Sequence, residues 1–257
     1  MEILSTPPSS PLHTIPVLFV HGGWCGAWCW AERFLPYFAS QGFAAHALSL
    51  RGHGGGEPAR RPTWASVLDY VEDVEQAVEQ LACDPVLVGH SMGGFVVQHY
   101  LRRHRAPAAV LMASVPHRGL SWRIMLKITR CGMPLSGRAP GAAAVHSLAA
   151  LLFTHSPPDD VLLRYLGLLN AESWRACAEM LGARLPRPGW VDTPMLVLAA
   201  GSDRILSPAE MYGLAHAYKA DLDVVPEIGH VMMLDEGWER AAKAIIAWLR
   251  KRSAWAS

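Results

Sequence analysis

The chain has few charged side chains and almost no net charge. Aspartate, glutamate, lysine and arginine make up 18% of its 257 residues, against the ~25% that is usual in soluble domains. The 23 basic and 22 acidic residues give a formal net charge of +1. No nucleic-acid partner is expected, because phosphate binding needs clustered excess cations. Disorder is not expected either, since 51% of the residues are hydrophobic.

Long apolar runs and a basic leader are also missing. The nearest approach to a membrane span, around residues 141–153, is interrupted by His146 and Ser147. The N-terminus begins acidic and soon reaches Pro7 and Pro8, which is not the basic-then-apolar order of a signal peptide. We therefore expect a cytoplasmic protein without an integral membrane segment.

The five cysteines show no evident pairing pattern. Cys25 and Cys29 have helical spacing, but no second cysteine or histidine pair follows at finger-like spacing. Free thiols in a cytosolic protein are the expected state. The glycine-rich segment 52–56 lacks the lysine and hydroxyl residue of a phosphate-binding loop. Neither a metal nor an organic cofactor is expected.

Short apolar runs alternate with helical patterns along most of the chain. The continuous runs predict buried strands at 17–20, 43–50, 86–88, 108–113, 195–200 and 222–225. Helices are predicted at 27–40, from a capping Thr63 to Leu81, at 95–104, from Ser207, and at 238–250. This order predicts an α/β fold with a mostly parallel sheet that helices cover on both faces.

One stretch breaks the alternation. Residues 115–190 show no convincing strand and are rich in leucine, alanine and arginine. We predict a helical cap here, inserted between core parts 16–114 and 191–257, with an N-terminal tail at 1–15. Nine basic and four acidic residues give this cap a charge of +5, which leaves −4 for the rest.

The strongest chemical signal is the pentapeptide from Gly89 to Gly93, which matches G-x-S-x-G around Ser91. It lies between an apolar run and a helical segment, the context of a nucleophile elbow. Glycines leave room for the sharp turn, and the helix amides that follow point at developing negative charge. The alternative is a plain glycine-rich turn.

A serine nucleophile needs a base and an acid that orients the base. Asp203 follows the predicted strand 195–200, and His230 follows the strand 222–225. Because the carboxyl ends of parallel strands share one edge, these residues should converge with Ser91. The alternatives are a turn aspartate and an ordinary loop histidine, one of twelve in the chain.

Acyl transfer also needs two donors for the oxyanion. The backbone amide of Met92, directly after the serine, is the first candidate. The amide of Gly23, in the loop from His21 to Trp24 after the first predicted strand, is the second. The alternative for that loop is a tight turn that uses the freedom of glycine.

Together these segments resemble the α/β-hydrolase superfamily, from Val17 onward. In that family the loop 21–24 is the oxyanion loop, Ser91 is the nucleophile, Asp203 is the acid and His230 is the base. The turn 51–54 resembles one of esterases and lysophospholipases, and the loop 21–30 is similar to that of plant methylesterases and hydroxynitrile lyases. Val231 stands where those lyases carry lysine, which counts against cyanohydrin chemistry. Too few residues precede Val17 for the family's two usual leading strands, so a trimmed sheet is expected.

The resemblance implies a serine hydrolase that cleaves a carboxylic ester with a small or medium apolar acyl group. A small-molecule ester is the expected partner, and Trp24, Trp122, Met125 and Phe153 are the expected substrate contacts. The same triad also serves lactonases, thioesterases, C–C bond hydrolases and cofactor-free perhydrolases. A non-catalytic ligand receptor on this scaffold stays open as well. Haloalkane dehalogenases and epoxide hydrolases need a carboxylate nucleophile, which Ser91 is not.

Overall fold

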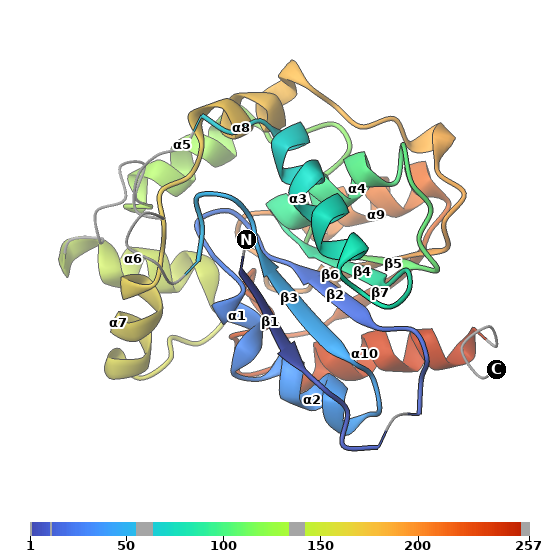
Figure 1. Cartoon of the computed structure of the whole chain (residues 1–257). Coiled ribbons are helices and arrows are strands. Elements are labelled where there is room, and N and C mark those ends of the chain that lie inside the picture. Colours follow the sequence, from blue (N-terminus) through green and yellow to red (C-terminus); the bar gives the residue numbers. More distant parts are fainter. Residues whose placement is uncertain (1, 11, 55–63, 134–141, 253–257) are drawn as a thin grey trace.

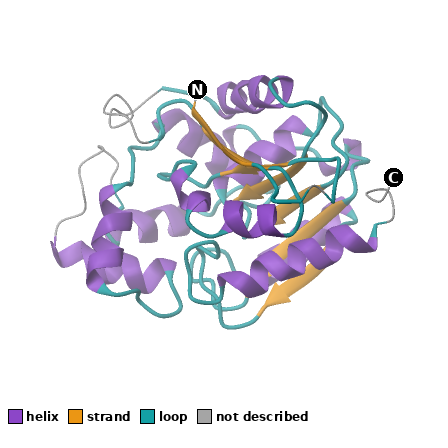
Figure 2. Ribbon diagram, turned by 60° about the horizontal axis from the view of Figure 1, so that its bottom comes forward, coloured by secondary structure: helices purple, strands orange, loops and turns teal. Residues whose placement is uncertain are grey.

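The fold is a seven-stranded sheet between two layers of helices (Figures 1 and 2). The computed structural model describes residues 2–10, 12–54, 64–133 and 142–252. The strands are β1 (Glu2–Thr6), β2 (Val17–Val20), β3 (Ala45–Ser49), β4 (Val86–His90), β5 (Ala109–Met112), β6 (Met195–Ala200) and β7 (Asp221–Val225). Their order in the sheet is β1-β3-β2-β4-β5-β6-β7, with β1 antiparallel and all other pairs parallel.

Helices cover both faces of the sheet. On one face lie α3 (Val67–Glu79), α4 (Met92–Tyr100) and α9 (Pro208–Tyr218), and on the other lie α1 (Trp28–Ala31), α2 (Phe34–Ser40) and α10 (Trp238–Lys251) (Figure 1). Every residue of β2, β4, β5 and β6 is buried. This burial explains why the strands are continuous apolar runs rather than alternating ones.

The predicted N-terminal tail is wrong in part, because residues 2–6 form the edge strand β1. Its register pairs Glu2 with Ser49 and Thr6 with Ala45. The Ser5 hydroxyl lies 2.8 Å from His46 Nδ1 across the pair. As an edge strand, β1 is only partly buried: Ile3, Leu4 and Thr6 are half-buried, and Glu2 and Ser5 are exposed. The prolines and serines that follow β1 are typical of a tail, so the sequence pattern did not predict this short strand. A trimmed, mostly parallel sheet is confirmed.

Two predicted helices also differ in detail. The helix expected at 27–40 is two short ones, because Arg33 adopts non-helical angles between α1 and α2. The Arg33 guanidinium donates hydrogen bonds to the carbonyl oxygens of Leu234 and Asp235. Helix α3 begins after Ser66, which forms a capping box with Asp69. The predicted cap Thr63 lies outside the described residues.

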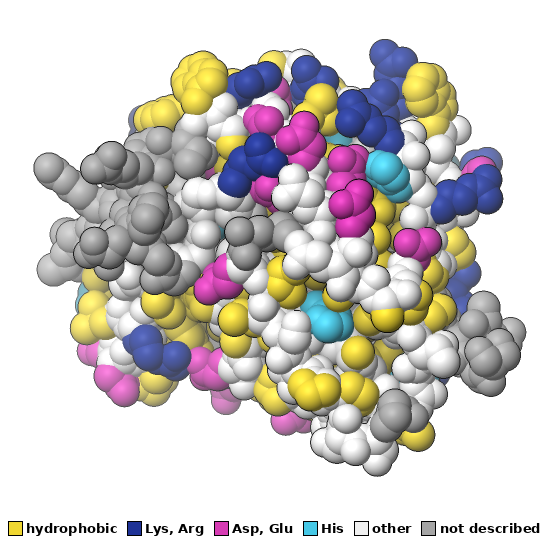
Figure 3. All heavy atoms as spheres, viewed as in Figure 1, with side chains coloured by type: hydrophobic (Ala, Val, Ile, Leu, Met, Phe, Trp, Pro, Cys, Tyr) yellow, Lys and Arg dark blue, Asp and Glu magenta, His cyan; other side chains and the backbone are white. Residues whose placement is uncertain are grey.

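The segment between β5 and β6 is helical in its described parts. It contains α5 (Trp122–Arg130), α6 (Ala142–Leu152), α7 (Asp159–Gly167), α8 (Trp174–Ala178), a π-helical turn (Glu179–Ala183) and a 3-10 turn (Pro188–Trp190). Its helices α5 to α8 lie together at one side of the sheet (Figure 1). Among the helices of the described ranges, none combines the length and the apolar character that crossing a membrane requires. Acidic and basic side chains are interspersed on the face in Figure 3, in keeping with the small net charge.

Candidate active site

Ser91 sits in a strained turn between β4 and α4. Its φ of 50° is rare for a residue with a side chain. A Cβ atom on Gly89 would lie 2.6 Å from the Gly93 carbonyl oxygen, and one on Gly93 would collide with the carbonyl oxygens of Val20 and His21. Gly89 is therefore required for the tightness of the turn itself, and Gly93 for its close approach to the end of β2. The turn presents Ser91 at the carboxyl end of β4.

This requirement predicts that Gly93→Ala destabilises the protein. The added methyl group meets fixed backbone rather than a movable side chain, so we expect a loss of about 1–3 kcal/mol in the free energy of unfolding. Gly213→Ala is the matched control, because nothing lies within 4 Å of its added Cβ in helix α9. It should stabilise by about 0.5–1 kcal/mol. Urea unfolding of both variants checks this, and a Gly93→Ala variant as stable as the wild type contradicts it.

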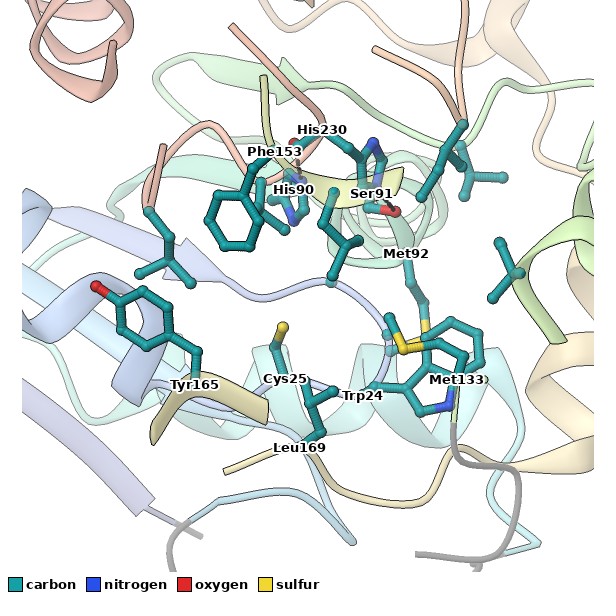
Figure 4. A pocket seen from close by; sticks show the side chains of 18 of the residues that line it. Trp24, Cys25, His90, Ser91, Met92, Met133, Phe153, Tyr165, Leu169 and His230 are labelled. Carbon is teal, nitrogen blue, oxygen red and sulfur yellow. Dashed lines mark hydrogen bonds between the residues drawn. The ribbon is translucent and has the colours of Figure 1, made fainter. Parts of the chain in front are cut away.

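The structure brings Ser91, His230 and Asp203 together. His230 Nε2 lies 3.1 Å from Ser91 Oγ, and its Nδ1 lies 2.8 Å from Asp203 Oδ2 (Figure 4 draws the first pair). The other oxygen, Asp203 Oδ1, accepts hydrogen bonds from the amides of Ile205 and Leu206 at 2.7 and 2.9 Å. The side chains of Asp203 and His230 are 0% and 5% exposed. This chain of contacts can move a proton from the hydroxyl to the imidazole.

The two predicted oxyanion donors lie in segments close to Ser91. Met92 is the first residue of α4, and the Gly22–Gly23 loop lies against Ser91, since a Cβ on Gly22 would be 3.1 Å from Ser91 Cβ. Within the described ranges, neither the Met92 nor the Gly23 amide donates to another protein group. Both remain available for a negatively charged oxygen beside Ser91.

His90 supports His230 and was missed by sequence reasoning. Its Nε2 donates to the His230 carbonyl oxygen at 2.9 Å. Burial, together with the neighbouring His230 ring, holds the pKa of His90 well below its usual range. A neutral, buried imidazole thus anchors the backbone of the candidate base. The only signal in the sequence was its position before Ser91, which the motif leaves free.

An apolar cavity opens beside Ser91. Its walls come from the loop after β2 and from α5, α6 and α7, and side chains such as Cys25, Phe153, Tyr165 and Leu169 surround the space in Figure 4. Among the described residues that line it, none is lysine, arginine, aspartate or glutamate. The Tyr165 hydroxyl is engaged, since it donates to Glu32 Oε1 at 3.1 Å. The described part of the lining therefore offers a carboxylate no lysine or arginine as an ion-pair partner.

Three of the four expected substrate contacts line this cavity, namely Trp24, Met125 and Phe153. Trp122, the fourth, does not line it. Trp122 opens α5 at its solvent end, its residue surface is 64% exposed, and the Arg123 guanidinium lies over its ring. Helix α5 instead turns Met125 and Ile128 toward the cavity.

The cysteines are free thiols in this structure. Burial and a hydrogen bond with Cys25 raise the pKa of the Cys29 thiol well above its usual range. In the described part of the chain, no group of three or more histidine, cysteine, aspartate or glutamate side chains is arranged to hold a metal ion.

A family model described as "Alpha/beta hydrolase family" matches residues 17–244, which span most of the sheet and the whole site. The chain belongs to this family. It is 30% identical to a probable esterase, PIR7A, of Oryza sativa subsp. indica over 166 residues, covering 57% of this chain and 62% of the rice protein. It is 35% identical to a bifunctional esterase/perhydrolase, DCH, of Acinetobacter calcoaceticus over 108 residues, covering 39% of this chain and 37% of that one.

The solved structures agree on the fold. A thermophilic esterase from Thermogutta terrifontis superposes with a TM-score of 0.76 at 23% identity, covering 97% of this chain and 93% of that one. An esterase from Exiguobacterium antarcticum superposes with a TM-score of 0.75 at 15% identity, covering 96% of this chain and 94% of that one. The alignments with the curated relatives span about three fifths of their length or less.

Proposed function

We propose that this alpha/beta hydrolase is a serine esterase that acts on uncharged carboxylic esters. The observation that carries the proposal is the Ser91–His230–Asp203 hydrogen-bond chain at the mouth of an apolar cavity. Relatives named as esterases support it. In this reading, residues 115–190 act as a cap that forms much of the acyl pocket.

The proposed reaction has two halves. Ser91 Oγ attacks the ester carbonyl carbon while His230 Nε2 takes the hydroxyl proton, and Asp203 stabilises the imidazolium that forms. The amides of Met92 and Gly23 hold the oxyanion. Collapse of this intermediate returns the proton from His230 to the departing alcohol and leaves an acyl-serine. Water, deprotonated by His230, then attacks the acyl group and regenerates Ser91.

A pair of esters with equal chain length tests the neutral-acyl preference. We expect p-nitrophenyl hexanoate to be cleaved with a kcat/KM at least about 10-fold above that of mono-p-nitrophenyl adipate, because the described cavity lining holds no lysine or arginine to pair with the adipate carboxylate. Initial rates at pH 7.5 measure this. Equal rates for the two esters contradict an apolar acyl site, and no turnover of any ester contradicts the esterase proposal and favours a binding function.

Perhydrolysis is a second candidate, because one relative is named a bifunctional esterase/perhydrolase. Hydrogen peroxide in place of water would attack the same acyl-serine and release a peracid. Adding peroxide to an ester assay and measuring the peracid decides between water and peroxide as the acceptor.

A further inference from the structure

Glu172, between α7 and α8, is a fully buried carboxylate that contacts the oxyanion loop. One oxygen, Oε2, accepts from the Trp24 amide at 3.1 Å and lies 3.1 Å from His53 Nε2. The other, Oε1, accepts from the Tyr70 hydroxyl and the Ser173 amide, each at 2.8 Å. Four donors therefore converge on one side chain that is 0% exposed.

The same segment holds Trp24 from its other side. The Asn170 backbone amide donates to the Trp24 carbonyl oxygen at 2.8 Å. Trp24 itself has a φ of 63°, a left-handed conformation that a residue with a side chain adopts at a cost. Glu172 Oε2 also stands only 3.2 Å from the place of a Cβ on Gly23. Glu172 thus holds the peptide group between Gly23 and Trp24, and the Asn170 backbone amide holds the next one, between Trp24 and Cys25.

His53 forms a buried ion-pair contact with Glu172. Both of its ring nitrogens lie beside acceptors, since Nε2 faces Glu172 and Nδ1 lies 3.2 Å from the Arg51 carbonyl oxygen. Burial lowers the pKa of His53, but Glu172, the Arg51 carbonyl and Asp73 together outweigh it, and the net change is a rise. Burial likewise raises the pKa of Glu172, and His53 brings it below its usual range.

His21, whose ring lies 5.0 Å from that of His53, is different. Its Nε2 accepts from the Leu50 amide, so its proton stays on Nδ1, beside the Gly22 carbonyl oxygen. Burial and the neighbouring His53 lower its pKa to about 3. Of the two rings, His53 is therefore the one whose charged form the surroundings favour.

We propose that Glu172 is a positioning residue for the oxyanion hole, which fixes the Trp24 peptide and thereby aims the Gly23 amide. This proposal rests on the proposed esterase function. A carboxylate is a costly way to fill a buried site unless its charge and hydrogen bonds are matched. Here the matched contacts come from the loop after β2, the turn after β3 and α3. The helical segment that shapes the acyl cavity thus also sets the geometry of the oxyanion donor.

The test compares Glu172→Ala with Glu179→Ala. Glu179 is a second buried glutamate of the same segment, and its Oε2 accepts from the Val67 amide of α3 at 2.7 Å rather than from the oxyanion loop. Glu172→Ala should lower kcat by about 10 to 100-fold with little change in KM. It should lower the affinity for a trifluoromethyl ketone inhibitor by a similar factor, because the adduct of this ketone with the serine carries the oxyanion. Glu179→Ala should lower Tm but leave kcat and the affinity for the ketone near those of the wild type.

Glu172→Asp decides the matter if the alanine variant does not fold. It keeps the charge but withdraws the carboxylate by one methylene from Trp24, so kcat and ketone affinity should still fall together. Wild-type values in a folded Glu172 variant, or an equal loss of kcat in Glu179→Ala, would overturn the positioning role. Absence of ester turnover in the wild type overturns the esterase function and the inference with it, whereas turnover that is insensitive to Glu172 overturns the inference alone.

Discussion

Replacing Ser91 by alanine is expected to lower kcat/KM for p-nitrophenyl hexanoate by about 10⁴-fold or more. The variant loses the hydroxyl that lies 3.1 Å from His230 Nε2. It keeps both oxyanion amides and the cavity, so KM should change little and a small residual rate should remain. Stopped-flow and steady-state assays with the same ester check this.

Ser202→Ala is the matched control for Ser91. Ser202 lies at the same edge of the sheet, directly before Asp203, and it is half-buried. Its loss should leave kcat/KM near the wild-type value. If Ser91→Ala retains wild-type activity, a different residue is the nucleophile.

The second large effect is expected from Asp203→Asn. An asparagine here must turn its amide oxygen toward the Ile205 and Leu206 amides, because these two N–H groups need an acceptor. Its NH₂ group then donates to His230 Nδ1, so the imidazole proton moves to Nε2. An Nε2 that already carries a proton cannot accept one from Ser91. We expect kcat to fall by about 10⁴-fold while Tm changes little.

Asp223→Asn controls for the loss of a carboxylate, since Asp223 is an exposed residue of β7. Its kinetics should match the wild type. Crystal structures of the Asp203→Asn variant should keep the Ser91–His230 distance, because the change concerns a proton and not the packing. Wild-type kcat in Asp203→Asn would show that Asp203 does not orient the base.

The sheet was predictable because its central strands are buried on both faces. Such strands need continuous apolar runs, and β2, β4, β5 and β6 appear in the sequence as those runs. The edge strand β1 needs no such run, so its sequence predicts a tail rather than a strand. The positions of Ser91, Asp203 and His230 were predictable for a related reason, since each follows a strand end at one edge of a parallel sheet.

The residues that escaped prediction act through tertiary contacts. Glu172 lies 148 residues from the Trp24 amide that it binds, in a segment without periodic pattern. His90 occupies a position that the motif leaves open, and its partner is a carbonyl oxygen 140 residues away. Trp122 is large and apolar, which favours a substrate contact in the sequence, but the direction of its side chain depends on how helix α5 packs. Neither composition nor spacing carries that information.

The central claim is that Ser91 is an activated nucleophile, and its most direct test is mass spectrometry after brief treatment with a fluorophosphonate. The account predicts a single adduct on the peptide that contains Ser91, formed rapidly in the wild type, slowly in Asp203→Asn and not at all in Ser91→Ala. A wild-type protein that hydrolyses esters but carries the adduct elsewhere, or carries none, would contradict the account.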